Sequence, residues 1–380
     1  MIAVVLGALL ASATATPAAA APAADAPPDR SAPPKPTAPK PFAIVTPTDF
    51  KLKNGLRVLY IERKRAPVVD VVATVDAGIV EDPAELPGLA GWTAGLLTEG
   101  AGDMDSIAYS DAQNAIGAQI GSGAEPEAAS MYLHVSSAKA AEGLKLFATG
   151  LLQPRFDDKE WQRVRQQVFG YFMYQSNEPQ ELAALAGGRA NWGKDSRLGV
   201  DLAGTPKALV AVKTSDMKAF YAAHYRPDTT TLVVVGDIDK KTLDKLLQDD
   251  FGAWTATGKA PTPSKLAGPL ALSARTVVAV DVPGAAQTVL RVQNPAAADI
   301  KPYTPDVSVM NMMLGVAFTS RLNSNLREKN HYSYGAGSHL VLFKNGNAFV
   351  ATAPVATAVT GPALTEMLKE LKNIHDLAPA

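Results

Sequence analysis

The sequence predicts an α+β protein in which one domain occurs twice, each copy being an antiparallel or mixed sheet flanked by helices. Three observations support this fold class. Short β-rich runs alternate with longer helical stretches, and their order repeats after roughly 215 residues, as expected of a duplicated domain. In addition, 47% of the 380 residues are hydrophobic, which is enough to bury sizeable cores.

The first domain, residues 45–256, is predicted to begin with a β-hairpin. Asn54-Gly55 separates two short apolar runs of alternating polarity, and this dipeptide favours a tight turn. The β-branched run 68–77 predicts a buried strand. The spacing of apolar residues predicts helices at 89–97, 106–116, 138–151, 157–175, 214–225 and 240–247, and strands at 130–136 and 229–235. The expected N-caps are Ser106 and either Thr214 or Ser215.

The second domain, residues 271–380, follows a proline-containing segment, 257–270, that we interpret as an interdomain linker. Its pattern repeats that of the first domain, with strands at 288–292 and 347–353 and helices at 306–314, 320–328 and 363–375. A counterpart of 157–236 is missing from this copy. We therefore expect a C-terminally truncated second domain, and an intact protein about 75 residues longer.

The N-terminus predicts export. Residues 1–24 resemble a secretory signal peptide, with an apolar run at 2–10 and a small-residue cleavage site at Ala18-Ala19-Ala20. Residues 25–44, rich in Pro and Ala, are predicted to be an extended linker. These features favour a periplasmic or envelope-associated protein without a membrane span after signal removal. The alternative is a disordered Ala/Pro leader that is not an export signal.

Composition excludes several classes of protein. The 36 Lys+Arg are balanced by 37 Asp+Glu, so nothing in the charge favours nucleic acid as a partner. The absence of Cys excludes disulfides, thiol nucleophiles and cysteine-ligated metals. The five His include no pair with the spacing of a helical metal site. No Ser–His–Asp order, phosphate loop or carboxylate pair indicates a different active site.

Several short segments occur in the order typical of a known family. They are 52–58 (LKNGLRV), 76–78 (DAG), 87–90 (PGLA), 204–206 (GTP), 220–227 (FYAAHYRP), 233–237 (VVVGD) and 326–329 (LREK). Together they resemble the insulinase/pitrilysin-type zinc metallopeptidases, the inverzincins, in the small two-domain form of the mitochondrial processing peptidase subunits. The resemblance runs from about residue 45 to the end of the chain. It implies the processing-peptidase architecture, which LuxS-type domains share.

The resemblance also identifies a missing metal site. In active members, H-x-x-E-H supplies two zinc ligands and a general base on one helix, and a later Glu is the third ligand. Here Gly91 and Gly95 occupy the two His positions, Ala94 the base position and Tyr171 the third-ligand position. None of these residues offers an imidazole or a carboxylate. The resemblance therefore implies a non-peptidase homologue that carries no zinc.

Two substrate-binding features of the family are retained. Arg327 and Tyr334, seven residues apart, match a pair that in the family contacts the substrate backbone at the scissile bond. Their alternative roles are an ordinary ion pair and a core tyrosine. The Gly-Leu usual between them is His331-Tyr332 here, which leaves the loop shape open. Residues 118–122 match the strand that pairs with extended substrates by β-addition, or they form an ordinary connecting loop.

The resemblance implies a division of labour, because small members of this family occur as pairs. We expect a non-catalytic subunit of an exported heterodimeric zinc metallopeptidase. A zinc-bearing paralogue would carry H-x-x-E-H, and this chain would supply Arg327 and Tyr334 to peptide substrates. The alternative is a catalytically silent peptide-binding or assembly subunit of an envelope complex, in which the pair is a relic.

Overall fold

The computed structural model describes residues 44–264, 268–270, 274–296, 300, 304–343 and 346–376. The predicted signal peptide and nearly all of the predicted 25–44 linker lie outside these residues. The chain divides into two units, 1–45 and Thr46–Ala380, and the second contains every described helix and strand. The prediction of an α+β fold is confirmed.

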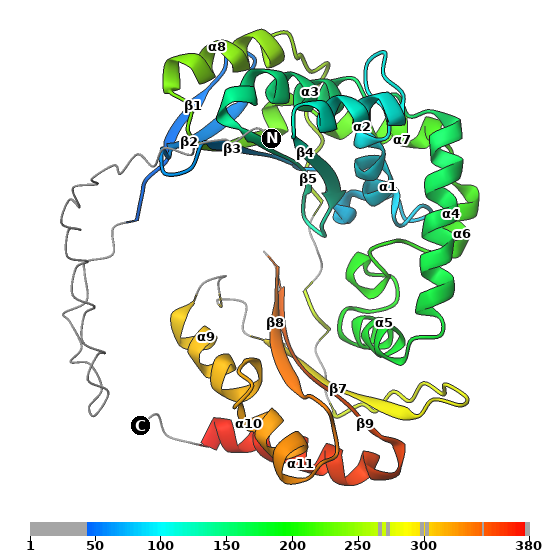
Figure 1. The fold of residues 1–380 in the computed structure, drawn as a ribbon. Coiled ribbons are helices and arrows are strands. Elements are labelled where there is room, and N and C mark those ends of the chain that lie inside the picture. The colour runs from blue at the N-terminus through cyan, green and yellow to red at the C-terminus, as the bar shows by residue number, and fades with distance from the viewer. Residues whose placement is uncertain are drawn as a thin grey trace, which may run out of the picture. The chain divides into compact units, whose positions relative to one another are not determined.

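The first half of this unit is built on a six-stranded mixed sheet (Figure 1). Across the sheet, the strands are β1 (Thr48–Lys51), β2 (Arg57–Glu62), β6 (Thr230–Gly236), β3 (Val68–Val75), β5 (Ala129–Ser136) and β4 (Gln119–Ala124). Only β2 and β6 run parallel; the other neighbours are antiparallel. The predicted hairpin forms between β1 and β2, where Gly55 has a φ of +95° that Gly adopts without strain.

Helices cover one face of this sheet, as Figure 1 shows. They are α1 (Leu89–Gly95), α2 (Ser106–Ala115), α3 (Ala140–Leu152), α7 (Thr214–His224) and α8 (Lys240–Phe251). All of them except α2 contribute side chains to one core. The helices α4 (Asp158–Gln175), α5 (Pro179–Trp192) and α6 (Pro206–Ala211) complete this part of the chain. Both predicted N-caps are wrong: Asp105, not Ser106, accepts from the Ala108 amide, and Lys213 precedes α7.

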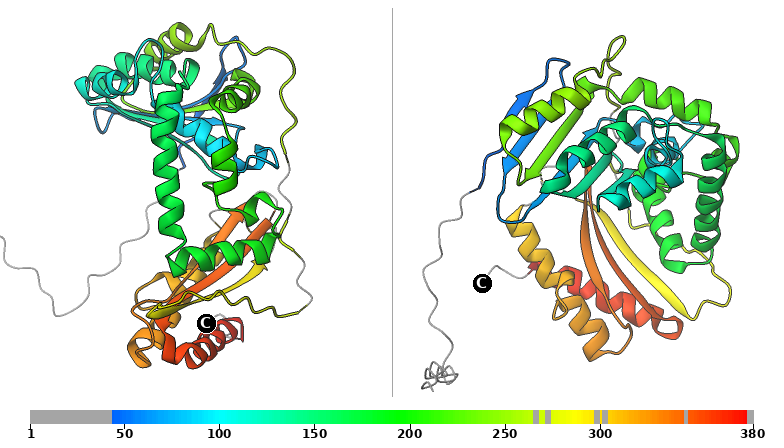
Figure 2. Two further views of the ribbon diagram at one scale, coloured as in Figure 1. Left: turned by 90° about the vertical axis from the view of Figure 1, so that its right-hand side faces the viewer. Right: turned by 45° about the horizontal axis from the view of Figure 1, so that its top comes forward.

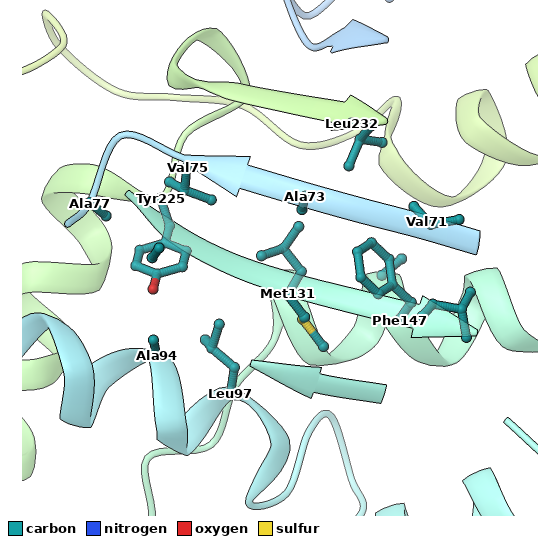
Figure 3. Packing of buried hydrophobic residues seen from close by; sticks show 14 of the residues in the cluster. Val71, Ala73, Val75, Ala77, Ala94, Leu97, Met131, Phe147, Tyr225 and Leu232 are labelled. Carbon is teal, nitrogen blue, oxygen red and sulfur yellow. The ribbon is translucent and has the colours of Figure 1, made fainter. Parts of the chain in front are cut away.

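Side chains alternate across the sheet. On β3, Val69, Val71 and Ala73 are fully buried against the helices, whereas the residues between them are exposed. Figure 3 shows Met131 of β5 and Phe147 of α3 filling the space between sheet and helices. The opposite face of the sheet is therefore open to solvent along β3 and β5.

The second half is built on a three-stranded antiparallel sheet with its own core. Its strands are β7 (Gln287–Ala296), β9 (Gly346–Ala356) and β8 (Gly337–Phe343), in that order. The helices α9 (Pro305–Asn311), α10 (Arg321–Asn323) and α11 (Thr360–Asp376) lie on one face of it (Figure 2). The first two continue as π-helical turns, Met312–Val316 and Ser324–Lys329.

The two sheets share one topology over three strands. The order β3-β5-β4 in the first sheet matches β7-β9-β8 in the second. Along the chain, two helices separate β3 from β4 and β7 from β8, and a helix follows β5 and β9. This correspondence bears out the predicted duplication. The sequence patterns did not predict β8, α5 or α6 as separate elements.

Candidate functional site

The helix that would carry the zinc motif is anchored at its start by a buried carboxylate. Asp82 is 4% exposed and accepts hydrogen bonds from the amides of Gly88 at 2.6 Å and Ala90 at 2.7 Å. These amides begin α1, and such a carboxylate satisfies donors that the helix leaves free. Burial raises the pKa of Asp82 to about 6, although the two amides and Arg197 act in the opposite direction.

The two positions of the zinc-binding histidines retain free space. Gly91 and Gly95 lie one turn apart on α1. A Cβ atom built on Gly95 meets no atom within 4 Å, and one on Gly91 meets only the Leu202 carbonyl oxygen, at 3.8 Å. The helix therefore has room for a Cβ atom at both positions, and no backbone contact there requires glycine.

The position of the general base is part of the core. Ala94 is fully buried, and its carbonyl oxygen accepts a hydrogen bond from Ser122 of β4 at 2.7 Å. In Figure 3, Ala94 lies on the same side of the sheet as the Tyr225 ring. The Tyr225 hydroxyl is buried and has no hydrogen-bond partner among the described residues. The Ala94 methyl group cannot accept a hydrogen bond from this hydroxyl or donate one to it. Nor can it act as a base that activates water.

The third-ligand position carries a phenol in place of a carboxylate. Tyr171 lies on α4, where Gln175 donates a hydrogen bond to its hydroxyl at 3.2 Å and another to Asp201. Burial, together with the charges of Asp201 and Glu181, raises the pKa of Tyr171. The four positions thus do not fit a zinc ion. Within the described ranges, no group of three or more His, Cys, Asp or Glu residues is arranged to hold a metal.

The structure brings the second predicted pair together. The Arg327 guanidinium carbon lies 4.7 Å from the centre of the Tyr334 ring. It also lies 4.7 Å from the centre of the Phe318 ring, so a cation is flanked by two aromatic residues. Its Nε atom is 3.2 Å from the Glu328 carboxylate. No pattern in the sequence indicated Phe318, because only the fold places the chain before α10 beside Arg327.

These groups are accessible to a ligand. Tyr334 is 82% exposed and Phe318 64% exposed, and about 29% of the Arg327 side chain is exposed. Tyr334 is therefore not a core tyrosine, which was the alternative role considered for it from the sequence. The terminal amino groups of Arg327 make no hydrogen bond within the described part of the chain. A guanidinium edge and a phenol are donors suited to a peptide carbonyl oxygen.

Local backbone geometry determines the shape of the loop between Arg327 and Tyr334. His331, which stands where the family usually has Gly, adopts the left-handed conformation that Gly favours, with φ of +55°. The Tyr332 amide then donates to the Leu326 carbonyl at 2.8 Å, and Ser333 bonds to the Pro354 carbonyl at 2.6 Å. The departure from the Gly-Leu pattern thus leaves a loop that turns back onto β9.

The predicted substrate-pairing strand forms at a sheet edge. Residues 119–124 are β4, which pairs with β5 on one side and is the outermost strand of the sheet. Its other side has no strand partner in the described part of the chain. The alternative of an ordinary connecting loop is wrong.

Comparisons with known proteins match both halves of the chain. The family model "Insulinase (Peptidase family M16)" matches residues 57–190, and "Peptidase M16 inactive domain" matches residues 211–378. An uncharacterized zinc protease of Mycobacterium tuberculosis is 24% identical over 316 residues, 80% of this chain and 69% of that protein. One of Bacillus subtilis, YmxG, is 20% identical over 290 residues, 76% of this chain and 69% of that protein.

Solved structures share the fold. A peptidase M16 inactive domain from Pseudomonas fluorescens superposes with a TM-score of 0.79 at 24% identity, covering 88% of this chain and 81% of that one. The periplasmic protease PqqL from Escherichia coli gives a TM-score of 0.68 at 16% identity, covering 88% of this chain and 38% of that one.

The fold and both matches define a protein of the zinc-metallopeptidase architecture. This chain belongs to the insulinase family, peptidase family M16. Within the family it is a non-catalytic member: the zinc-site positions hold no imidazole or carboxylate, and its second half matches the domain described as inactive. Among the residues described, no helix is both long and apolar enough to cross a membrane.

Proposed function

We propose that this chain is the non-catalytic subunit of an exported heterodimeric zinc metallopeptidase. Its partner is a paralogue that carries H-x-x-E-H and zinc, and its substrates are peptides. The observation that carries the proposal is the asymmetry between the two sites. The metal positions retain their helix but no ligand, whereas Arg327 remains flanked by Tyr334 and Phe318 on an accessible surface.

In this proposal the chain contributes binding and charge stabilisation. The partner's zinc, when bound, supplies the water that attacks the peptide bond. Arg327 and Tyr334 donate hydrogen bonds to the carbonyl oxygen of the substrate and stabilise the negative charge that develops on it. The flanking rings limit the orientations of the guanidinium, so less entropy is lost when the substrate binds.

Export is the second component of the proposal. The support is the signal-peptide pattern at 1–24, together with a structural neighbour described as a periplasmic protease. A fusion of residues 1–45 to a reporter that is active only outside the cytoplasm tests it. Activity of the fusion is expected, and activity equal to that of a leaderless reporter would reject export.

Reconstitution tests the role of Arg327. The purified chain alone is expected to show no peptidase activity and no stoichiometric zinc. Addition of a zinc-bearing M16 paralogue from the same genome is expected to give cleavage of a fluorogenic peptide. Arg327→Ala should abolish this gain, whereas Lys329→Ala, which removes a nearby exposed cation, should preserve it. Equal cleavage with both variants would reject the role.

A second candidate function is an assembly or peptide-binding subunit of an envelope complex. The observation that favours it is a set of exposed apolar residues on α9 and the segment that follows it up to Phe318, since such groups often mark protein–protein contacts. At least half of each side chain is exposed for Val309, Met312, Met313, Val316 and Phe318. Purification from the native host with metal analysis separates the candidates. A zinc-bearing M16 partner supports the first, and a zinc-free envelope assembly supports the second.

A further inference from the structure

Two of the three residues that the edge strand β4 places on the open face of the sheet are glycines. Gly121 pairs with Tyr132 of β5 and Gly123 pairs with Ser130, and paired residues point to the same face. The residue between the glycines faces the other way, because the Ser122 hydroxyl bonds to the α1 backbone. Two glycines on one face weaken a strand, and glycine in a strand often marks close approach of a ligand or another backbone.

An aromatic ring covers the first of these glycines. A Cβ atom on Gly121 would lie 2.5 Å from Tyr132 ring atoms, so the ring leans from β5 across β4. Tyr132 is 50% exposed, and its neighbour on β3, Val72, is 37% exposed. Space beside the second glycine is empty, because a Cβ on Gly123 meets nothing within 4 Å.

On the open face, the residues paired across β4, β5 and β3 form rows. The rows on either side of the one that contains Gly121, Tyr132 and Val72 are polar. One contains Gln119, His134 and Asp70, where the His134 Nδ1 atom lies 2.7 Å from an Asp70 carboxylate oxygen. The other contains Gly123, Ser130 and Thr74. The row with Val72 and Tyr132 is thus a single apolar position on the open face beside the edge.

A peptide strand added to β4 would lie about 4.8 Å away, with its backbone bonded to the outer edge of this strand. The Ile120 amide of β4 already donates a hydrogen bond to the Gln113 side chain at 3.2 Å, so the peptide would replace that contact. The side chain opposite Gly121 on the open face would then lie against the Tyr132 ring. The edges and faces of an aromatic ring attract other aromatic rings, so an aromatic side chain at this position gains a contact with Tyr132. No other row along β4 offers an aromatic contact.

We propose that Gly121, Tyr132 and Val72 form a subsite that selects an aromatic side chain in an extended peptide added to β4. The inference rests on the proposed peptide-binding function and specifies its substrate class. The subsite determines which side chain of the peptide is preferred, whereas Arg327 binds the carbonyl oxygen of the peptide backbone.

Two matched peptides test the subsite. Both are fluorescein-labelled nine-residue peptides of alternating Thr and Lys, one with Phe and the other with Ala at the centre. Dissociation constants for the full chain are measured by fluorescence anisotropy. We expect the Phe peptide to bind roughly fivefold tighter than the Ala peptide. Tyr132→Thr, which keeps a β-branched residue in the strand, should remove this difference.

Two further variants make the result specific. Tyr174→Ala removes an exposed aromatic residue from α4 and should preserve the preference for Phe. Gly121→Ala places a methyl group against the ring and should reduce the preference. Circular dichroism verifies that each variant retains the fold.

The outcomes separate this inference from the proposed function. Equal binding of both peptides by the unmodified chain, with weaker binding of both by Arg327→Ala, overturns the subsite and leaves the peptide-binding role. A preference for Phe that survives Tyr132→Thr also overturns it. Absence of binding of either peptide overturns both. A Tyr132-dependent preference without any effect of Arg327→Ala supports the subsite and removes the role of Arg327.

Discussion

Single residues determine what each half of this protein can do. Gly91, Ala94, Gly95 and Tyr171 remove a metal site without removing the helix that would hold it. Arg327, in contrast, lies between two rings at equal distances of 4.7 Å. The resemblance to the family predicted the roles of Arg327 and Tyr334, but it gave no sign of Phe318, whose contact depends on how the chain turns into α10.

The left-handed conformation of His331 leads to a prediction about stability. A side chain at a φ of +55° crowds the backbone at a cost of about 1 kcal/mol. His331→Gly is therefore expected to raise the free energy of unfolding by up to about 1 kcal/mol and Tm by about 2 °C. His331→Ala retains a Cβ and is the control. Thermal scans that show equal Tm for both variants would contradict the strain argument.

The buried Asp82 predicts a pH dependence. Its pKa rises from 3.8 to about 6 on folding, so the folded state binds more protons than the unfolded state between these values. The contribution of Asp82 to stability therefore decreases as pH rises from 4 to 6. Relative to Asp82→Asn, which does not titrate, the unmodified chain should lose stability over this range. Urea unfolding at pH 4, 5, 6 and 7 measures the difference. A constant difference would show that burial does not raise this pKa.

At the scale of elements, hydrophobic periodicity predicted most helices and strands but not their ends. Asp105 caps α2, although Ser106 was expected, because the carboxylate one residue earlier reaches the Ala108 amide. The predicted helix 320–328 is a short α10 followed by a π-helical turn. The periodicity of apolar residues cannot indicate a π-helical turn, because such a turn differs from an α-helix in its backbone hydrogen bonds and not in which residue types it contains.

The helix α1 permits a direct test of the metal-site argument. Gly91→His with Gly95→His places two imidazoles one turn apart, where neither Cβ meets a close contact. The double variant is expected to bind Zn²⁺ roughly tenfold or more tightly than either single variant, because the second ligand acts within the same molecule. Isothermal titration calorimetry makes the comparison. Equal affinities would show that the two positions do not share an accessible face.

At the scale of the whole molecule, the duplicated topology produces two separate cores. One gathers side chains between the six-stranded sheet and its helices, and the other includes Leu290, Leu322, Leu326 and Met367 around the three-stranded sheet. Each half buries its own apolar face. A substitution in one core should therefore affect its own sheet first.

Matched core substitutions test this separation. Leu326→Ala and Leu133→Ala each shorten a buried leucine, in the second and first core, and each is expected to cost about 2–5 kcal/mol. Amide hydrogen exchange should show loss of protection in β9 for the former and in β5 for the latter. Equal loss in both strands for either variant would indicate a single cooperative unit.

The sequence alone determined the fold class and the repeat, because these depend on the periodicity and order of apolar residues. Its resemblance to the family predicted the missing zinc ligands and the Arg327–Tyr334 pair. Tertiary structure decided which surfaces those residues form. It placed Phe318 against Arg327 and aligned Gly121 with Tyr132 at an open sheet edge. Such contacts join segments whose relative positions depend on strand register and chain reversal, and no local pattern in the sequence specifies either.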